Sequence, residues 1–246
     1  MKKVMKVIAA LMLMTTVVCA AGCTKSDEPN NGGNNNGGNN GGGNQSHHEY
    51  VDLGLPSGTL WAVCNVGADT PEDYGDYFAW GETEPKTAYY WNTYKYAKGI
   101  SGEDPQITKY CQNSSYGYNG FTDHLTVLQP SDDAATANWG SGWCTPTKEQ
   151  WEELLNNTTN TWTMRNGVNG RCFKGLNGNS FFLPAAGYRS GSTLYLAGTN
   201  GGYWWSSLYA DVPYCAWGYY FKSGGSVMTG NDRYCGRSVR PVRSAK

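Results

Sequence analysis

The chain has little histidine and little charge. Of its 246 residues 3 are His, and charged residues account for 16%, well below the roughly 25% of a typical soluble domain. His124 is the single histidine after residue 48. A histidine-rich zinc site therefore cannot be assembled in that part of the chain, and a Ser-His-Asp triad has one candidate base with no local support. We expect His124 to be a structural or surface residue.

Sequence patterns typical of catalytic or nucleic-acid-binding proteins are also missing. No glycine-rich phosphate loop follows an expected strand, and no acidic calcium-binding loop is present. The formal net charge is −1, and it becomes 16 − 20 = −4 without the three lysines of residues 1–22. Nucleic acid needs a basic protein surface for its phosphates. We expect no catalytic residues, no metal, no cofactor and no nucleic-acid partner.

The N-terminus has the organisation of an export signal. No run of 18 apolar residues is present, which excludes a membrane-spanning channel. The basic segment Met1–Lys6 is followed by an apolar stretch of twelve residues, Val7–Val18. The next segment, Ala20-Ala21-Gly22-Cys23, resembles a bacterial lipobox, although Ala20 stands where such motifs usually have Leu. The resemblance implies that residues 1–22 are a lipoprotein signal peptide and that Cys23 is lipidated. The alternative is an ordinary cleavable signal followed by an unrelated cysteine.

Residues 23–48 are expected to be a flexible tether that begins with the lipidated cysteine. Lys25-Ser26-Asp27-Glu28 is similar to the export signal of surface lipoproteins in the Bacteroidetes, so we expect a lipid-anchored outer-membrane protein exposed at the cell surface. The following Asn/Gly-rich segment contains nothing apolar to bury, and a coil of this length reaches roughly 25–30 Å. Residues 49–246 then form one domain.

This domain is predicted to be α+β, with more strand than helix. Dense turn signals separate short aromatic and β-branched runs, which are typical of antiparallel hairpins. Thr147 and Gln150 form a capping box before the apolar face of Trp151, Leu154 and Leu155, which predicts a helix that ends near Asn156-Asn157. A shorter helix is expected around Asp132–Ala137. The expected strands are Leu60–Val66, Thr161–Arg165, Arg171–Leu176, Phe181–Tyr188, Ala216–Phe221 and Ser238–Val242.

Long sequence blocks carry a family resemblance that covers nearly all of residues 49–246. The blocks are Tyr50–Gly58, Leu60–Gly67, Tyr74–Glu82, Asp132–Ala135, Asn138–Gly140, Trp143–Thr147, Phe182–Arg189, Tyr203–Ser207 and Gly236–Val242. Together they resemble the Fibrobacter succinogenes major paralogous domain of Bacteroidetes lipoproteins. That family is similar in turn to the C-type-lectin-like fold of formylglycine-generating enzymes and of the variable proteins of diversity-generating retroelements. The resemblance therefore implies a C-type-lectin-like fold.

Six cysteines of the domain allow fifteen pairings, which the sequence cannot resolve. They are Cys64, Cys111, Cys144, Cys172, Cys215 and Cys235. Formylglycine-generating enzymes use a closely spaced catalytic pair, whereas the nearest pair here, Cys215 and Cys235, is twenty residues apart. An oxidase of that type stays open as an alternative function. We expect Cys215 and Cys235 to lie on antiparallel neighbours and to form a disulfide, the alternative being two independent thiols.

The segment 208–237 is the expected ligand-binding face for an unknown external protein or glycan. In the retroelement variable proteins the corresponding stretch is diversified and contacts the ligand, and Tyr and Arg dominate interface hot spots. The expected binding residues are Tyr209, Asp211, Tyr214, Tyr220, Lys222, Asp232, Arg233 and Tyr234. The alternatives are an ordinary aromatic sheet and a structural envelope lipoprotein without a ligand. We expect Arg233, Arg237, Arg240 and Arg243 to form ion pairs rather than an anion site.

Overall fold

The computed structural model describes residues 48–101, 104–209 and 212–245. The predicted signal peptide, the predicted lipidation site Cys23 and all of the predicted tether except His48 lie outside these residues, and so does Asp211. None of the helices in the described part is long and apolar enough to cross a membrane.

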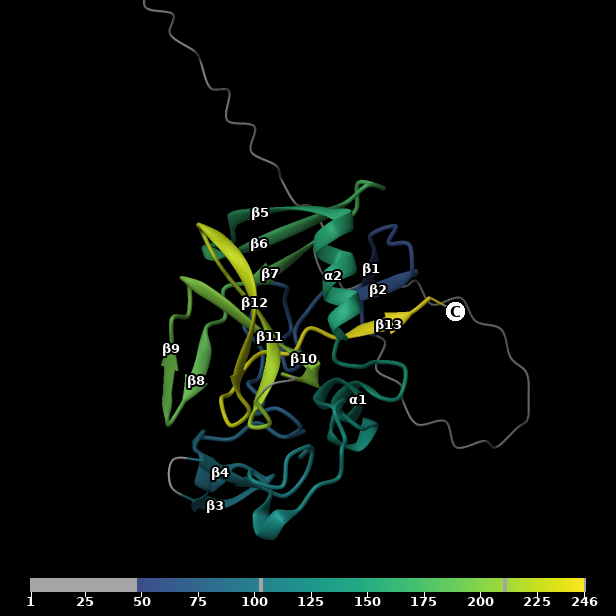
Figure 1. The fold of residues 1–246 in the computed structure, drawn as a ribbon. Helices are drawn as coiled ribbons and strands as arrows, with labels where there is room; N and C mark the ends of the chain where they lie inside the picture. Colours follow the sequence, from purple (N-terminus) through teal and green to yellow (C-terminus); the bar gives the residue numbers. More distant parts are fainter. Residues whose placement is uncertain (1–47, 102–103, 210–211, 246) are drawn as a thin grey trace, which may run out of the picture.

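The described residues form small antiparallel sheets with two α-helices, which confirms the α+β class (Figure 1). The three-stranded sheets have the orders β1-β2-β13, β5-β6-β7 and β10-β11-β12, and two-stranded sheets join β3 to β4 and β8 to β9. The strands are β1 (Tyr50–Asp52), β2 (Thr59–Ala62), β3 (Ala97–Ser101), β4 (Asp104–Ile107), β5 (Thr158–Arg165), β6 (Val168–Gly175), β7 (Ser180–Pro184), β8 (Tyr188–Ser190), β9 (Thr193–Tyr195), β10 (Asn200–Leu208), β11 (Cys215–Lys222), β12 (Gly225–Asp232) and β13 (Val242–Ser244).

Both predicted helices are present, and their caps explain where they begin. Helix α2 (Lys148–Asn157) starts after Thr147, whose hydroxyl accepts from the Gln150 amide while the Gln150 side chain accepts from the Thr147 amide. This is the predicted capping box, and the helix ends at Asn157 as expected. Helix α1 (Ala134–Trp139) starts two residues later than its expected range because the Asp133 carboxylate caps it by accepting from the Ala135 and Thr136 amides.

Strand β10 of the sheet β10-β11-β12 is buried on both faces. Along β10 the side chains alternate, so that Trp204 packs into one hydrophobic cluster with Phe78 and Trp80, while Trp205 packs into a second cluster with Trp151 of α2. The Tyr203-Trp204-Trp205 block therefore joins the two cores through consecutive residues. Figure 1 shows α2 beside this sheet, with β5, β6 and β7 above it.

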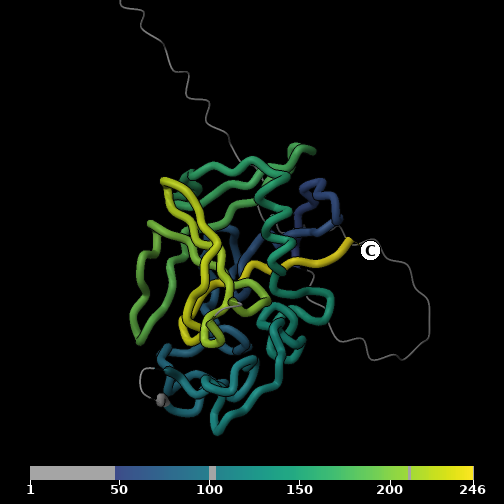
Figure 2. Tube along the Cα trace, viewed as in Figure 1, coloured from purple at the N-terminus to yellow at the C-terminus, as the bar shows by residue number. Residues whose placement is uncertain are grey.

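The two ends of the described domain meet in one sheet. Strand β2 pairs antiparallel with β1 on one side and with β13 on the other, where Val242 lies opposite Trp61. In Figure 2 the last segment of the chain crosses the molecule to reach the first strands.

Three strand predictions need correction. The expected strand Leu60–Val66 ends at Ala62, the last residue of β2. The expected strand Phe181–Tyr188 is divided into β7 and β8 at Ala185–Gly187, where Gly187 adopts a positive φ of 67°. The expected strand Ser238–Val242 is not a continuous strand, because Ser238 forms a single bridge and Val242 is the first residue of β13. Strands β10 and β12 were not predicted. Strand β12 is polar and contains two glycines, which weaken the usual strand pattern.

Candidate ligand-binding site

The predicted binding residues do not share one surface. Lys222 lies at the hairpin end of β11, opposite Gly225, whereas Cys215 lies at the other end, opposite Asp232. These ends are separated by roughly 23 Å at the usual rise of a strand. Tyr214, Asp232 and Tyr234 gather near the Cys215 end. The predicted set is therefore split along the strand.

Arg233 is a core residue, and its predicted role on an exposed face is wrong. Its side chain has no exposed surface. Its Nε donates to the Tyr94 hydroxyl at 2.9 Å, and its two terminal nitrogens donate to backbone carbonyl oxygens. Those carbonyls belong to Lys109, Tyr110 and Pro213 at 2.9–3.2 Å. The guanidinium thus ties the end of β12 to the segment before α1.

Tyr209 and Tyr220 lie on opposite faces of the sheet. Its ring contacts Trp217 at a centroid distance of 4.5 Å and covers Gly230, where any Cβ would overlap the ring. Trp217 and Gly230 are opposite each other in the ladder, and side chains of Tyr220 and Lys222 point to the other face because strand residues alternate. Tyr209 is therefore separated from the rest of the predicted set.

Four aromatic side chains meet at the Cys215 end of the sheet. The Trp91 ring contacts Tyr234 at 4.9 Å and Tyr214 at 6.2 Å between centroids, both edge to face. Tyr116 extends this contact, because its ring lies 5.5 Å from that of Tyr214. All four side chains are partly exposed. Two predicted residues, Tyr214 and Tyr234, are thus brought together by Trp91.

Strand β8 continues this cluster toward Tyr220. The backbone of Arg189 in β8 exchanges two hydrogen bonds with that of Gly236, two residues after Tyr234, and this bridge brings Tyr188 next to Arg237. The Tyr188 ring stacks on that of Tyr195 at 5.5 Å. We call the partly exposed set Trp91, Tyr116, Tyr188, Tyr195, Tyr214, Tyr220 and Tyr234 the aromatic strip.

Three tyrosine hydroxyls of the strip, those of Tyr214, Tyr220 and Tyr234, stay protonated near neutral pH. Burial raises the pKa of Tyr214, Tyr220 and Tyr234 above the ordinary value, although the charge of Arg237 opposes this shift at Tyr220. A neutral phenol has an apolar ring and a hydroxyl that both donates and accepts. The strip therefore offers stacking and hydrogen bonding without charge.

The arginine next to the strip is buried and poorly paired. The Arg237 guanidinium lies 5.2 Å from the Tyr188 ring centroid and 5.4 Å from that of Trp204. Its Nη2 donates to the Asn231 side chain, whereas its Nε and Nη1 have no hydrogen-bond acceptor among the described residues. A Cβ at residue 202 would overlap Nη1, so glycine is needed there.

The expected ion pairs of the C-terminal arginines are absent from the described structure. No described carboxylate lies within 4.0 Å of Arg233, Arg237, Arg240 or Arg243. Arg240 donates to the Asn65 side chain and to the carbonyls of Ala62 and Val63. Arg243 lies over the rings of Tyr50 and Trp143. Carbonyl groups and aromatic faces take the place of the carboxylates that we expected.

The predicted disulfide is also absent, because Cys215 and Cys235 are both free thiols. The residue opposite Cys215 in the ladder is Asp232, and the Cys215 thiol donates to its carboxylate at 3.5 Å. Cys235 lies three residues further on, beyond the position that faces Cys215 directly. Burial, the largest cause in both cases, raises the pKa of Cys215 to about 12 and that of Cys235 to about 11. Thiols of this kind carry little nucleophilic thiolate at neutral pH.

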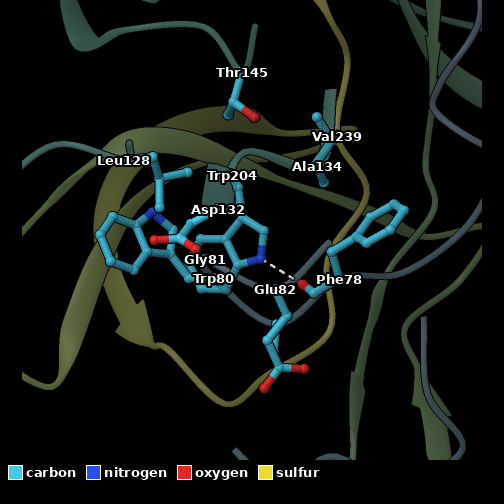
Figure 3. A pocket seen from close by; sticks show the side chains of 11 residues that line it. Phe78, Trp80, Gly81, Glu82, Leu128, Asp132, Ala134, Thr145, Trp204 and Val239 are labelled. Atoms are coloured by element: carbon cyan, nitrogen blue, oxygen red, sulfur yellow. Dashed lines mark hydrogen bonds between the residues drawn. The ribbon is translucent and has the colours of Figure 1, made fainter. Parts of the chain in front are cut away.

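A small cavity lies inside the first hydrophobic cluster, away from the strip (Figure 3). It is bordered by Trp80, Trp204 and Leu128, with Glu82 and Asp132 at its wall, and its volume of about 10 Å³ suits one water molecule. Both carboxylates are already engaged, Glu82 with Lys86 and Asp132 with Lys109. Within the described ranges, no three His, Cys, Asp or Glu side chains are grouped to hold a metal ion.

Sequence reasoning missed the part of the strip that precedes the central sheet. Trp91 and Tyr116 lie about 100 residues or more before Tyr214, in segments without a regular hydrophobic pattern. Tyr188 was predicted as a strand residue but not as part of the site. Their aromatic side chains are the only signal in the sequence, and it does not specify which of them meet.

A family described as a domain of unknown function (DUF8237) matches residues 162–242. These residues run from β5 to the start of β13 and contain the β10-β11-β12 sheet together with Tyr188, Tyr214 and Tyr234. Trp91 and Tyr116 lie before the matched part. No curated protein and no solved structure matches the chain.

Proposed function

We propose that this protein is a binding module that recognises an external ligand through the aromatic strip. The observation that carries the proposal is the continuity of the strip, from Tyr116 and Tyr214 through Trp91 to Tyr234, with Tyr188 brought beside it by the Arg189–Gly236 bridge. Large aromatic side chains with few rotatable bonds supply contact area at a low entropic cost, and they are enriched at the energetic centres of interfaces.

The proposal keeps Tyr214, Tyr220 and Tyr234 from the set predicted by the sequence. It adds Trp91, Tyr116, Tyr188 and Tyr195 and removes Arg233, which has no exposed surface. Tyr209 lies away from the strip, Lys222 lies two residues beyond Tyr220 on the same face, at the end of β11, and Asp232 lies near the Cys215 end with its carboxylate turned to Cys215. Strand pairing and ring contacts hold the strip in place, so little ordering is needed when a ligand binds.

We propose further that the domain has the C-type-lectin-like fold of the Fibrobacter succinogenes major paralogous family. It would be displayed on the outer membrane through lipidated Cys23 and the Asn/Gly-rich segment. The α+β class and the meeting of the first and last strands in one sheet are in keeping with that fold. Diversification of residues 208–237 by a retroelement belongs to the same proposal.

A role in binding rather than catalysis agrees with the state of the thiols. An oxidase of the formylglycine-generating type needs reactive cysteines, and burial raises the pKa of Cys215 and Cys235 far above neutral pH. We therefore favour recognition over the oxidase alternative.

The test is a binding screen with variants of the strip. The purified chain is applied to an array of glycans and to an array of bacterial and host surface proteins. Trp91→Ala should reduce any specific signal by about tenfold or more, since truncating a central aromatic typically costs about 2 kcal/mol of binding. Tyr214→Ala should have a similar effect, because its ring contacts Trp91.

The matched control is Tyr50→Ala. Tyr50 is a partly exposed tyrosine, 43% accessible, on β1 and outside the strip, so this variant should bind like the unmodified chain. A ligand whose binding is unchanged by both Trp91→Ala and Tyr214→Ala would contradict the proposal, provided that the variants melt as the unmodified chain does.

A further inference from the structure

The aromatic strip is assembled from segments that are far apart in the sequence. Trp91 begins a short 3-10 helix, Tyr214 precedes β11, and Tyr234 follows β12. The ladder between β11 and β12 brings Tyr214 and Tyr234 to the same end of the sheet, but Trp91 lies outside every described sheet. Strand pairing by itself therefore does not fix the Trp91 ring against the two tyrosines.

Arg233 holds the backbone on both sides of Tyr214. Its main-chain amide donates to the Tyr214 carbonyl at 3.0 Å, and its Nη1 donates to the Pro213 carbonyl at 3.1 Å. These carbonyls belong to the two planar peptide groups that flank the Tyr214 Cα, so Arg233 restrains the direction in which the Tyr214 side chain leaves the backbone. Tyr234 follows Arg233 directly in the chain and is restrained with it.

Arg233 also reaches the Trp91 ring, through Tyr94. Its Nε donates to the Tyr94 hydroxyl at 2.9 Å, and this hydroxyl donates to the Trp80 carbonyl at 2.7 Å. The Trp80 amide donates in turn to the Arg233 carbonyl at 2.8 Å, which closes a circuit of three hydrogen bonds. The Tyr94 ring, held at its hydroxyl, packs edge to face against Trp91 at a centroid distance of 5.6 Å.

The other hydrogen bonds of the guanidinium go to the segment that holds Tyr116. The Lys109 carbonyl accepts from Nη2 at 2.9 Å, and the Tyr110 carbonyl accepts from Nη1 at 3.2 Å. The Ile107 amide of the same segment donates to the Tyr116 carbonyl at 2.7 Å. Arg233 is thus connected to the segments that carry four aromatic side chains of the strip, namely Trp91, Tyr116, Tyr214 and Tyr234.

We propose that Arg233 is the positioning residue of the aromatic strip, which fixes Trp91, Tyr214 and Tyr234 relative to one another from the buried side. It does not touch the ligand, because its side chain has no exposed surface. The inference rests on the proposed function for its consequence, which is that the rings are ordered before a ligand arrives, so that less entropy is lost on binding. The arrangement of the rings itself can be measured without a ligand.

An arginine suits this position better than a lysine. The guanidinium is planar and carries five N–H donors in fixed directions, so one side chain serves four acceptors in three separate segments. A lysine carries its three donors on a single atom and cannot reach all of these acceptors at once. Arg233→Lys therefore keeps the charge but loosens the connection between the segments.

Fluorine NMR of the purified full chain, labelled with fluorotryptophan, tests the proposal. The resonance that is absent from Trp91→Phe belongs to Trp91. Arg233→Lys and Tyr94→Phe disrupt the same hydrogen bond from its two ends, so each should shift or split the Trp91 resonance. The resonance of Trp162, which lies on β5 and outside the strip, should stay unchanged in both variants.

Tyr203→Phe is the matched control for a loss of stability. The Tyr203 hydroxyl, like that of Tyr94, donates to one backbone carbonyl and accepts from one side chain, and Tyr203 is fully buried in the second hydrophobic cluster. Tyr203→Phe should therefore lower the melting temperature about as much as Tyr94→Phe does, but it should leave the Trp91 resonance in place.

Two outcomes overturn the proposal. One is a Trp91 resonance that neither Arg233→Lys nor Tyr94→Phe alters, and the other is a Trp91 resonance that Tyr203→Phe alters as much as Tyr94→Phe does. If Arg233→Lys does not fold, the comparison of Tyr94→Phe with Tyr203→Phe decides. The proposed function fails separately, in a binding screen where no ligand depends on Trp91, and that result leaves the measured arrangement of the rings unaffected.

Discussion

Arg233 and Arg237 lie four residues apart and are both buried, but their surroundings differ. Arg233 directs all three guanidinium nitrogens at acceptors, namely one tyrosine hydroxyl and three backbone carbonyls. Arg237 has one acceptor, the Asn231 side chain, and rests between two aromatic rings. Burial lowers the pKa of Arg237, whereas its neighbours oppose that shift.

The difference shows that burial alone does not say what an arginine does for the fold. Arg233 reaches from the end of β12 to the Lys109 and Tyr110 carbonyls and so joins two distant segments. Tyr110 has a positive φ of 61° and is fully buried, a backbone state that costs energy for a residue with a side chain. Arg233 stabilises this state, whereas the hydrogen bond of the Arg237 guanidinium goes to Asn231, six residues earlier in the sequence.

The largest expected effect is that of Arg233→Met, which keeps the length of the side chain but removes every donor. It should lower the free energy of unfolding by about 3–5 kcal/mol, since three buried carbonyls and the Tyr94 hydroxyl lose their partner. Denaturant unfolding followed by tryptophan fluorescence measures the change. A loss below about 1 kcal/mol would remove the distinction between the two arginines.

Asp132→Asn should have an intermediate effect, about 2 kcal/mol, because Asp132 holds the same segment from its other side. Its carboxylate accepts from the Tyr96 and Tyr110 hydroxyls and pairs with Lys109. Burial alone would raise the pKa of Asp132, but these partners outweigh it and lower the pKa to about 2. The unfolded-state value is near 3.8. The stability advantage over the Asn variant is therefore complete above pH 4 and should shrink as the pH falls toward 2.

Unfolding curves of both proteins at several pH values between 2 and 6 measure this dependence. An advantage that stays constant across the whole range would show that the ionised carboxylate is not the source of the stability. Combining Asp132→Asn with Arg233→Met should cost less than the sum of the two, because both residues hold Lys109 and Tyr110.

Arg237→Met should change the free energy of unfolding least, by no more than about 1 kcal/mol in either direction. The variant loses one hydrogen bond and two ring contacts, but it no longer buries a charge that has no carboxylate beside it. The same unfolding experiment measures it, with Arg233→Met as the reference. A loss as large as that of Arg233→Met would contradict this expectation. It would mean that Arg237 contributes as much to stability as an arginine whose nitrogens all have acceptors.

Local signals were sufficient for the helices and for several hairpins. The capping box at Thr147 fixes where α2 begins through atoms that are three residues apart in the sequence. The run Ala216–Phe221 predicts β11 because it is rich in aromatic residues, which favour strands. Strand β12 could not be predicted in the same way, since its glycines and small polar residues give no period.

The candidate site depended on contacts between distant segments. Tyr214 and Tyr234 could be selected as exposed aromatic residues, but the Trp91 ring that joins them precedes them by more than 100 residues. Arg233 was misassigned because a single sequence does not distinguish a buried guanidinium with carbonyl acceptors from an exposed one. The prediction of a disulfide was wrong because of the strand register, in which Asp232 rather than Cys235 lies opposite Cys215.

The pairing of β2 with β13 has a consequence for how the chain reaches its native state. Val242 and Trp61 are opposite each other although about 180 residues separate them, and contacts of this kind slow folding because a long loop must close first. Strand β13 is synthesised about 180 residues after β2. The sheet β1-β2-β13 therefore cannot close until residues 242–244 have been synthesised, and one edge of β2 stays unpaired until then.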